Sequence, residues 1–132
     1  MIYGLRLALI LLAIAVAAGA FGAHALRDVI DERLFQAWQT GVLYHFLHAL
    51  GVVAVTLVLN AEWMDPRKGK WVVRFHVAGI LLFSGSLYGM ALGNAAGVDL
   101  SFLGPLTPIG GLSFVAGWML AAISVSLPVL RD

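Results

Sequence analysis

The chain has 132 residues, of which 61% are hydrophobic and only 11% are charged, with a formal net charge of +1. Soluble domains carry about a quarter of charged residues, so this composition excludes a soluble globular domain and predicts a protein whose main partner is the lipid bilayer. No basic patch is interleaved with aromatic residues, so we expect no nucleic-acid partner. The chain has no cysteine, which excludes disulfides, iron–sulfur clusters, thiolate metal sites and a cysteine nucleophile.

Four apolar stretches are long enough to cross a bilayer, which takes about 20 helical residues because the hydrocarbon core is about 30 Å thick. These stretches are residues 2–25, 40–59, 71–92 and 107–128. The segments between them are short. We therefore expect a single integral membrane domain over residues 1–132, an all-α polytopic protein folded as a compact bundle of four transmembrane helices.

The first stretch also resembles a secretory signal peptide, because Arg6 precedes an apolar run that ends in the small-residue strings AGA and AHA. Cleavage there would leave three helices. The apolar run, however, continues past the usual length of a signal core. We therefore expect it to be retained as the first transmembrane helix.

Lys and Arg near the ends of the spans predict the orientation, because these residues are kept on the cytoplasmic side. With four spans, both termini and the second loop share one face, which carries Arg6, Arg67, Lys68, Lys70, Arg74 and Arg131. The opposite face carries Arg27 and Arg33, offset by Asp28, Asp31 and Glu32. We expect a bacterial inner-membrane protein with both termini in the cytoplasm.

Boundary signals agree with this layout. Asp31 is a candidate N-cap of the second helix, Thr107 is a candidate N-cap of the fourth with Pro108 after it, and Asp65-Pro66 breaks the chain between the second and third. A belt of tryptophans is expected at headgroup depth, formed by Trp38, Trp63 and Trp71.

Small residues repeat at steps of four on three of the predicted helices. The rows are Ala15, Gly19 and Ala23; Gly85, Gly89 and Gly93; and Ser113, Gly117 and Ala121. Lipid tails are as apolar as leucine, so transmembrane helices associate by close approach through such faces. Glycine and alanine are also common in membrane helices in general, but three aligned rows favour a packing role.

Polar side chains gather in the half of the predicted bundle that faces away from the cytoplasm: His24, Tyr44, His45, His48, Ser84, Ser86, Tyr88, Thr107 and Ser113. The inner half keeps mainly Thr56, Ser124 and Ser126. Tyr44, His45 and His48 are three or four residues apart and share a helix face, which should point inward because ionisable groups avoid lipid. We expect an outer polar pocket with Arg27 near its mouth.

The histidines allow several interpretations. His45 and His48 could ligate a metal or haem with His24 as a third ligand, provided that the first helix continues to Val29 and the turn centres near Phe35. With the turn near Asp31, His24 would instead lie about 10 Å from the level of His45. The alternatives are structural hydrogen bonds and proton or small-solute handling, and we assign no metal or cofactor.

The remaining intramembrane groups suggest little chemistry. His76 is expected to extend toward the cytoplasmic headgroups beside Arg74. No carboxylate lies deep in a span, and the chain has no GxGxxG, Walker, HExxH or serine-elbow motif. The sequence therefore gives little support for an enzyme.

Four strings in chain order, GAFGAHAL, YHFLHAL, LFSGSLYGMAL and GPLTPIGGLSFVAGW, resemble those of the small bacterial membrane family catalogued as domain of unknown function 423, to which an animal transmembrane protein 256 is similar. The resemblance covers essentially the whole chain and implies a four-helix inner-membrane protein without an established activity. Members often have glutamine at the position of His45, whereas His24 and His48 look like the family's own. The resemblance thus shifts the expectation from a metal site to a hydrogen-bonding network of His24, Tyr44, His48, Ser86 and Tyr88.

Two functional hypotheses follow. The first is an accessory or partner-binding membrane subunit, in a homo-oligomer or a larger membrane complex. The second is an outward-facing site or conduit for a small ligand, a proton, or a metal or haem, built on His24, Tyr44 and His48, and a haem- or metal-dependent enzyme would be its catalytic form.

Overall fold

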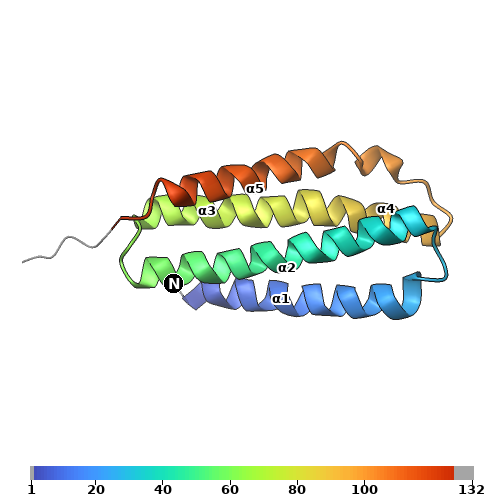
Figure 1. Ribbon diagram of the computed structural model, residues 1–132, viewed down its shortest axis with the longest axis horizontal. Helices are drawn as coiled ribbons and strands as arrows, with labels where there is room; N and C mark the ends of the chain where they lie inside the picture. Colours follow the sequence, from blue (N-terminus) through green and yellow to red (C-terminus); the bar gives the residue numbers. More distant parts are fainter. Residues whose placement is uncertain (1, 127–132) are drawn as a thin grey trace, which may run out of the picture.

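Four long helices lie side by side with their connections at the two ends of the bundle (Figure 1). The computed structural model describes residues 2–126, and all of its extended regular elements are helical in this range. The first helix is α1 (Ile2–Phe21), which continues into the π-helical segment η1 (Gly22–Leu26), and the second is α2 (Glu32–Asn60). The predicted all-α bundle of four membrane-spanning helices is confirmed.

The third and fourth helices are each built from several segments. The third consists of α3 (Pro66–Gly79), the π-helical segment η2 (Ile80–Ser84) and α4 (Gly85–Ala95). A short 3-10 turn, η3 (Ser101–Leu103), then leads to α5 (Leu106–Ala122). The predicted end of the fourth span at Pro128, and the basic residue Arg131, lie outside the described residues.

Capping hydrogen bonds mark the starts of two helices. The Asp31 carboxylate accepts from the backbone N–H of Leu34 at 2.9 Å, so the predicted cap is confirmed and α2 begins at Glu32, before the apolar span predicted from residue 40. The Asp65 carboxylate accepts from the N–H groups of Arg67 and Lys68, and Pro66 occupies the first turn of α3.

The predicted cap of the last helix is wrong. α5 begins at Leu106, and Pro105 in the N-cap position makes no side-chain cap hydrogen bond. The Thr107 hydroxyl lies 2.7 Å from the Ser86 hydroxyl of α4 instead. The Thr107 side chain therefore makes a contact between two helices and does not cap α5.

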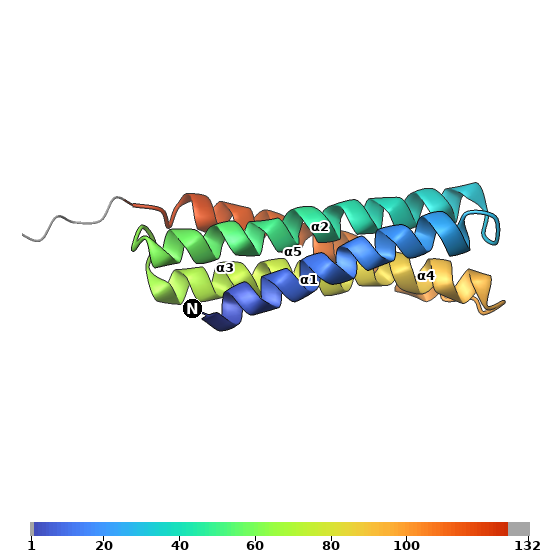
Figure 2. The ribbon, with the colours of Figure 1, turned by 90° about the horizontal axis from the view of Figure 1, so that it is seen from below.

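The helices pack in the order α1, α2, third helix, α5, with α1 and α5 at opposite edges in Figure 1. Seen from below, α1 lies in front of the other helices (Figure 2). The start of α1, the loop 61–65 and the last described residues lie at the same end of the bundle, where the backbone N–H of Ser126 donates to the carbonyl of Trp63 at 2.9 Å.

The small-residue row of α5 packs against α3. The Ser113 hydroxyl donates to the Phe75 carbonyl at 2.8 Å, and a Cβ on Gly117 would lie 2.8 Å from the ring of His76. One turn before Ser113, a Cβ on Gly110 would lie only 2.3 Å from the backbone nitrogen of Phe83 in η2. Here a glycine lets the backbones of two helices approach each other, and the predicted rows of small residues did not include Gly110.

The other two rows behave differently. On α1, Ala15 is fully buried and Gly19 lies against Val42 of α2, so this row does face a neighbouring helix. The row on α4 is wrong as a helix-packing face. A Cβ on Gly85 would find its nearest atom at 3.9 Å, whereas Gly89 and Gly93 lie under the leucines of the segment that follows α4, Leu103 and Leu100.

The segment after α4 folds back because of its backbone geometry. Gly97 has φ +72°, and the next N–H, of Val98, donates to the Gly93 carbonyl at 2.8 Å, which closes the helix end. In the same loop the Asp99 carboxylate accepts from the N–H of Ser101 at 2.9 Å, and this bond holds the pKa of Asp99 below its usual value. The row of glycines on α4 thus serves a loop and not a helix contact.

We predict that Gly110→Ala destabilises the bundle by about 1–3 kcal/mol, because the added methyl meets backbone that cannot move without separating α5 from η2. Gly85→Ala is the matched control. It adds a methyl in open space and should be neutral or stabilising by a few tenths of a kcal/mol through helix propensity. Unfolding of both variants in mixed micelles with increasing SDS checks this, and equal stability of the two would contradict it.

Candidate functional site

Two histidines from different helices meet inside the bundle. His48 of α2 and His76 of α3 have their ring centroids 5.6 Å apart, and their side chains are 6% and 0% exposed. His48 lies 12 residues from the end of α2 at Asn60 and His76 lies 10 residues from the start of α3, which is about 15–18 Å along each helix. Both rings are therefore deep between the ends of the helices.

Aromatic rings of α5 complete this cluster. Phe114 stacks on His48 with centroids 3.4 Å apart, and Trp118 meets His76 edge-on at 4.6 Å. We call these four residues the histidine core: His48, His76, Phe114 and Trp118. It joins α2, α3 and α5.

Each histidine of the core bonds to the backbone of its own helix. Nδ1 of His48 lies 2.7 Å from the Tyr44 carbonyl, and Nδ1 of His76 lies 2.8 Å from the Val72 carbonyl. A carbonyl oxygen only accepts, so Nδ1–H is the donor in both rings and Nε2 of the neutral ring is an acceptor. Nε2 of His76 is buried and has no hydrogen-bond partner among the described residues.

Glycines make the space for these rings. A Cβ on Gly51 would lie 3.0 Å from Trp118 and 3.1 Å from His76, and a Cβ on Gly79 would lie 2.4 Å from Phe114. Gly51 follows His48 by three residues and Gly79 follows His76 by three residues. This repeated spacing is the signal in the sequence that could have identified the core.

The expectation that His76 extends to the cytoplasmic headgroups is wrong, since its side chain is completely buried. Arg74 does lie at the surface, where its guanidinium packs 4.8 Å from the Trp71 ring centre. The two residues are two positions apart and so point to opposite sides of α3, at about 100° per residue.

The remaining predicted polar residues form separate contacts. Nδ1 of His45 lies 3.2 Å from the Tyr88 hydroxyl, Ser84 donates to the Gly41 carbonyl at 2.7 Å, and Ser86 pairs with Thr107. Tyr44 is 37% exposed and stacks on Phe83. The single network of His24, Tyr44, His48, Ser86 and Tyr88 is wrong, because most of these side chains reach a backbone carbonyl or a different partner first.

His24 and Arg27 lie outside all of these contacts. Both are exposed near the end of the first helix, where Gly22 abuts the Trp38 ring and the turn ends at Asp31. Tyr44 is six residues and His48 ten residues further along α2 than Trp38, which is about 9 and 15 Å along the helix. His45 lies between these two residues in the sequence, so His24, which lies near Trp38, is not level with His45.

The histidine set considered for a metal is accordingly not assembled. Within residues 2–126, no three His, Cys, Asp or Glu side chains form a group that could hold a metal ion. The trio of His24, His45 and His48 is thus wrong as a ligand set in this structure.

Trp38 departs from the predicted interfacial belt. It is 4% exposed, its ring packs at a tilt against that of Tyr88, and its indole N–H donates to the Ala18 carbonyl of α1 at 3.0 Å. A Cβ on Gly22 would lie 2.3 Å from its Nε1. Trp63 and Trp71, in contrast, are exposed as the belt prediction requires.

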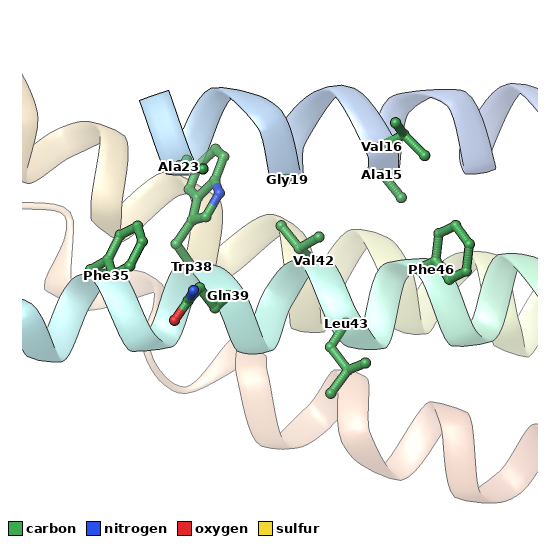
Figure 3. A pocket seen from close by; sticks show the side chains of 11 residues that line it. Ala15, Val16, Gly19, Ala23, Phe35, Trp38, Gln39, Val42, Leu43 and Phe46 are labelled. Atoms are coloured by element: carbon green, nitrogen blue, oxygen red, sulfur yellow. The ribbon is translucent and has the colours of Figure 1, made fainter. Parts of the chain in front are cut away.

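A groove of about 390 Å³ runs between α1 and α2. Figure 3 shows Ala15 and Gly19 of α1 and Ala23 of η1 on the side that faces α2, with the Trp38 ring reaching toward the first helix. The other residues that line it are Val16, Gly22, Phe35, Gln39, Leu43 and Phe46. We call this the α1–α2 groove, and it is mostly apolar.

Comparison with known proteins identifies the family. The family model described as "Protein of unknown function (DUF423)" matches residues 18–111, from the end of α1 to the start of α5. The chain belongs to the DUF423 family. This match agrees with the resemblance drawn from the four sequence strings.

Full-length relatives of this DUF423 chain are membrane proteins by name. It is 37% identical to the UPF0382 membrane protein YwdK of Bacillus subtilis, over 84% of this chain and 85% of the relative. It is 38% identical to a UPF0382 membrane protein of Schizosaccharomyces pombe (80% and 86%), and 36% identical to one of Haemophilus influenzae (79% and 77%). No solved structure matches the chain. The protein is an integral membrane protein of this family.

We predict that His76→Ala destabilises this DUF423 protein by about 1–2 kcal/mol, because it leaves a cavity between α2, α3 and α5. His24→Ala, at an exposed site, should change the free energy of unfolding by less than about 0.5 kcal/mol. SDS unfolding in mixed micelles measures both. A loss at His24 as large as that at His76 would contradict the placement of the two residues.

Proposed function

We propose that this protein is an accessory, partner-binding membrane subunit, and that its α1–α2 groove receives a transmembrane helix of another membrane protein. The single observation that carries the proposal is the groove itself, lined on one wall by Ala15, Gly19 and Ala23. Transmembrane helices associate where small residues let two backbones approach closely.

Two features favour a protein helix over a lipid chain as the occupant. Gln39 lines the groove, and its side-chain amide makes no hydrogen bond to another side chain or backbone group in the described range. An amide in this position suits a partner helix that carries a polar group, because polar side chains act as interhelical contacts in membranes. The acyl chain of a lipid has no group that could form a hydrogen bond with the amide.

The packing of α1 is the second feature. Only 11% of its most apolar window is buried in the bundle, compared with 17% for the fourth helix and 39% for α2 and for the third helix. Most of α1 is therefore left for contacts in the membrane. As part of the same proposal, the protein lies in the bacterial inner membrane with both termini cytoplasmic, where it would join a larger complex.

The alternative function, an outward-facing ligand site or conduit on His24, Tyr44 and His48, has weaker support. His24 is separated from the other two residues along the bundle axis, and Tyr44 points its ring at Phe83. The histidine core lies deeper and is filled by Phe114 and Trp118.

The test is photo-crosslinking with p-benzoylphenylalanine at Phe46, which lines the groove, and at Leu112, an exposed position on α5. We expect an adduct with one identified membrane protein from Phe46 and none from Leu112. Gly19→Leu and Ala23→Leu fill the groove and should each reduce the Phe46 adduct about tenfold, since overpacking costs about 1–3 kcal/mol.

Ala20→Leu is the matched control, because Ala20 is exposed on α1 and does not line the groove. It should leave the adduct unchanged. Three results would overturn the proposal: adducts with lipid alone, an adduct only with a second copy of this chain, or equal loss from Ala20→Leu and the two groove-filling variants.

A further inference from the structure

A second cavity, of about 490 Å³, opens at the end of the bundle where both described chain ends lie. Its floor is α2, through Thr56 and Leu59, and its walls are the start of α1 and the first half of α3. The wall residues are Tyr3, Gly4, Pro66, Lys70, Val73 and Arg74. We call it the basal trough. It is distinct from the α1–α2 groove and the histidine core.

The trough combines an apolar floor with positive charge on one wall. Lys70 and Arg74 are four residues apart on α3 and so lie on one face of the helix. No acidic side chain is among the described residues that line the trough. The nearby Asp65 carboxylate is engaged in capping α3, through the N–H groups of Arg67 and Lys68. The two cations thus lack an anionic partner within the trough.

The Arg74 side chain is held in place by a neighbour. Its guanidinium packs 4.8 Å from the Trp71 ring centre, a cation–π contact that leaves its N–H groups free to bind an anion. A guanidinium also suits phosphate geometry better than other cationic side chains, because its N–H groups form a planar fork.

The length of the third helix places these cations at headgroup depth. Its 30 residues extend over about 45 Å, and the hydrocarbon core is about 30 Å thick. A tilt of about 20° takes up only a small part of this excess of about 15 Å, so most of it lies outside the hydrocarbon. The polar first turns of α3, Pro66 to Arg74, contain the chain's densest group of Lys and Arg residues and are the part suited to the headgroup layer.

We propose that the basal trough binds an anionic phospholipid, with the lipid phosphate between Lys70 and Arg74 and an acyl chain along Leu59 and Val73. A free phosphate ion would use only the two cations and leave the apolar floor uncovered. A phospholipid matches both parts of the trough, and basic pockets between transmembrane helices are recognised sites for anionic headgroups. This site does not depend on the proposed partner helix.

The test is native mass spectrometry of the full chain in a neutral detergent, titrated with dioleoyl-phosphatidylglycerol or with dioleoyl-phosphatidylcholine. We expect saturable binding of one phosphatidylglycerol and at least about tenfold weaker binding of phosphatidylcholine. In the double variant Lys70→Gln/Arg74→Gln, the dissociation constant for phosphatidylglycerol should rise about thirtyfold, at about fivefold for each cation near a membrane surface.

The double variant Arg67→Gln/Lys68→Gln is the matched control. It removes the same charge from the same helix at residues that do not line the trough, and its affinity should change less than about threefold. Circular dichroism of each variant checks that the helices remain folded. Inorganic phosphate and sn-glycerol 3-phosphate, at millimolar concentration, should not displace the lipid.

Each of several results would overturn the proposal. Equal weakening in the two double variants would mean general charge attraction without a site. Equal affinity for phosphatidylcholine would mean an apolar cleft without headgroup recognition. Displacement by inorganic phosphate would mean a phosphate site and not a lipid site, and no saturable lipid binding at all would leave the trough without this ligand.

Discussion

Polar groups between these helices have no water to bind in the hydrocarbon, so partners inside the protein stabilise them. Among the described residues, Nε2 of His45, Nε2 of His76 and the Ser124 hydroxyl are buried without one. Three other side chains bond to the backbone carbonyl of a neighbouring helix. Trp38 binds the Ala18 carbonyl, Ser84 binds the Gly41 carbonyl, and Ser113 binds the Phe75 carbonyl. These three bonds tie α2 to α1, the third helix to α2, and α5 to the third helix.

Such bonds require helices to approach closely, and glycines allow this. Gly22 makes room for Trp38, Gly110 meets the backbone of η2, and Gly51 and Gly79 make room for the histidine core. Hydrophobic burial cannot drive association when the surrounding lipid is equally apolar, so the packing of these surfaces and the hydrogen bonds between them must hold the bundle together. Open space remains in the α1–α2 groove, in the basal trough and in a surface pocket of about 390 Å³ beside His48, Gly51 and Trp118.

Much of the fold could be predicted from hydropathy, because a bilayer sets the length and polarity of a spanning helix. The cap at Asp31 and the chain break at Asp65-Pro66 could also be predicted, because they depend on local backbone geometry. The side of each helix that packs against a neighbour could not be predicted in this way. Periodicity says which residues share a side of a helix, but not which side meets a neighbour, and the glycines of α4 therefore pack under a loop.

The histidines illustrate the same limit. His76 is two residues from the exposed Arg74, and this proximity in the sequence suggested that both side chains extend to the headgroups. About 200° of helix rotation separates them, however, so the His76 side chain is buried. His24 has a polar neighbourhood in sequence but lies at the exposed end of the first helix. The candidate site thus moved from the outer half of the bundle to its edges and its centre, which only the rotation and depth of each helix could determine.

We propose that the four helices cross the bilayer with the loop 61–65 on the cytoplasmic side. The chain has no cysteine, so single cysteines report the topology directly. Ala61 and Ala96 are exposed C-cap residues at opposite ends of the bundle. In intact cells a membrane-impermeant maleimide should label Ala96→Cys and should label Ala61→Cys only after permeabilisation. Labelling of Ala61→Cys in intact cells, or protection of Ala96→Cys, would contradict the account.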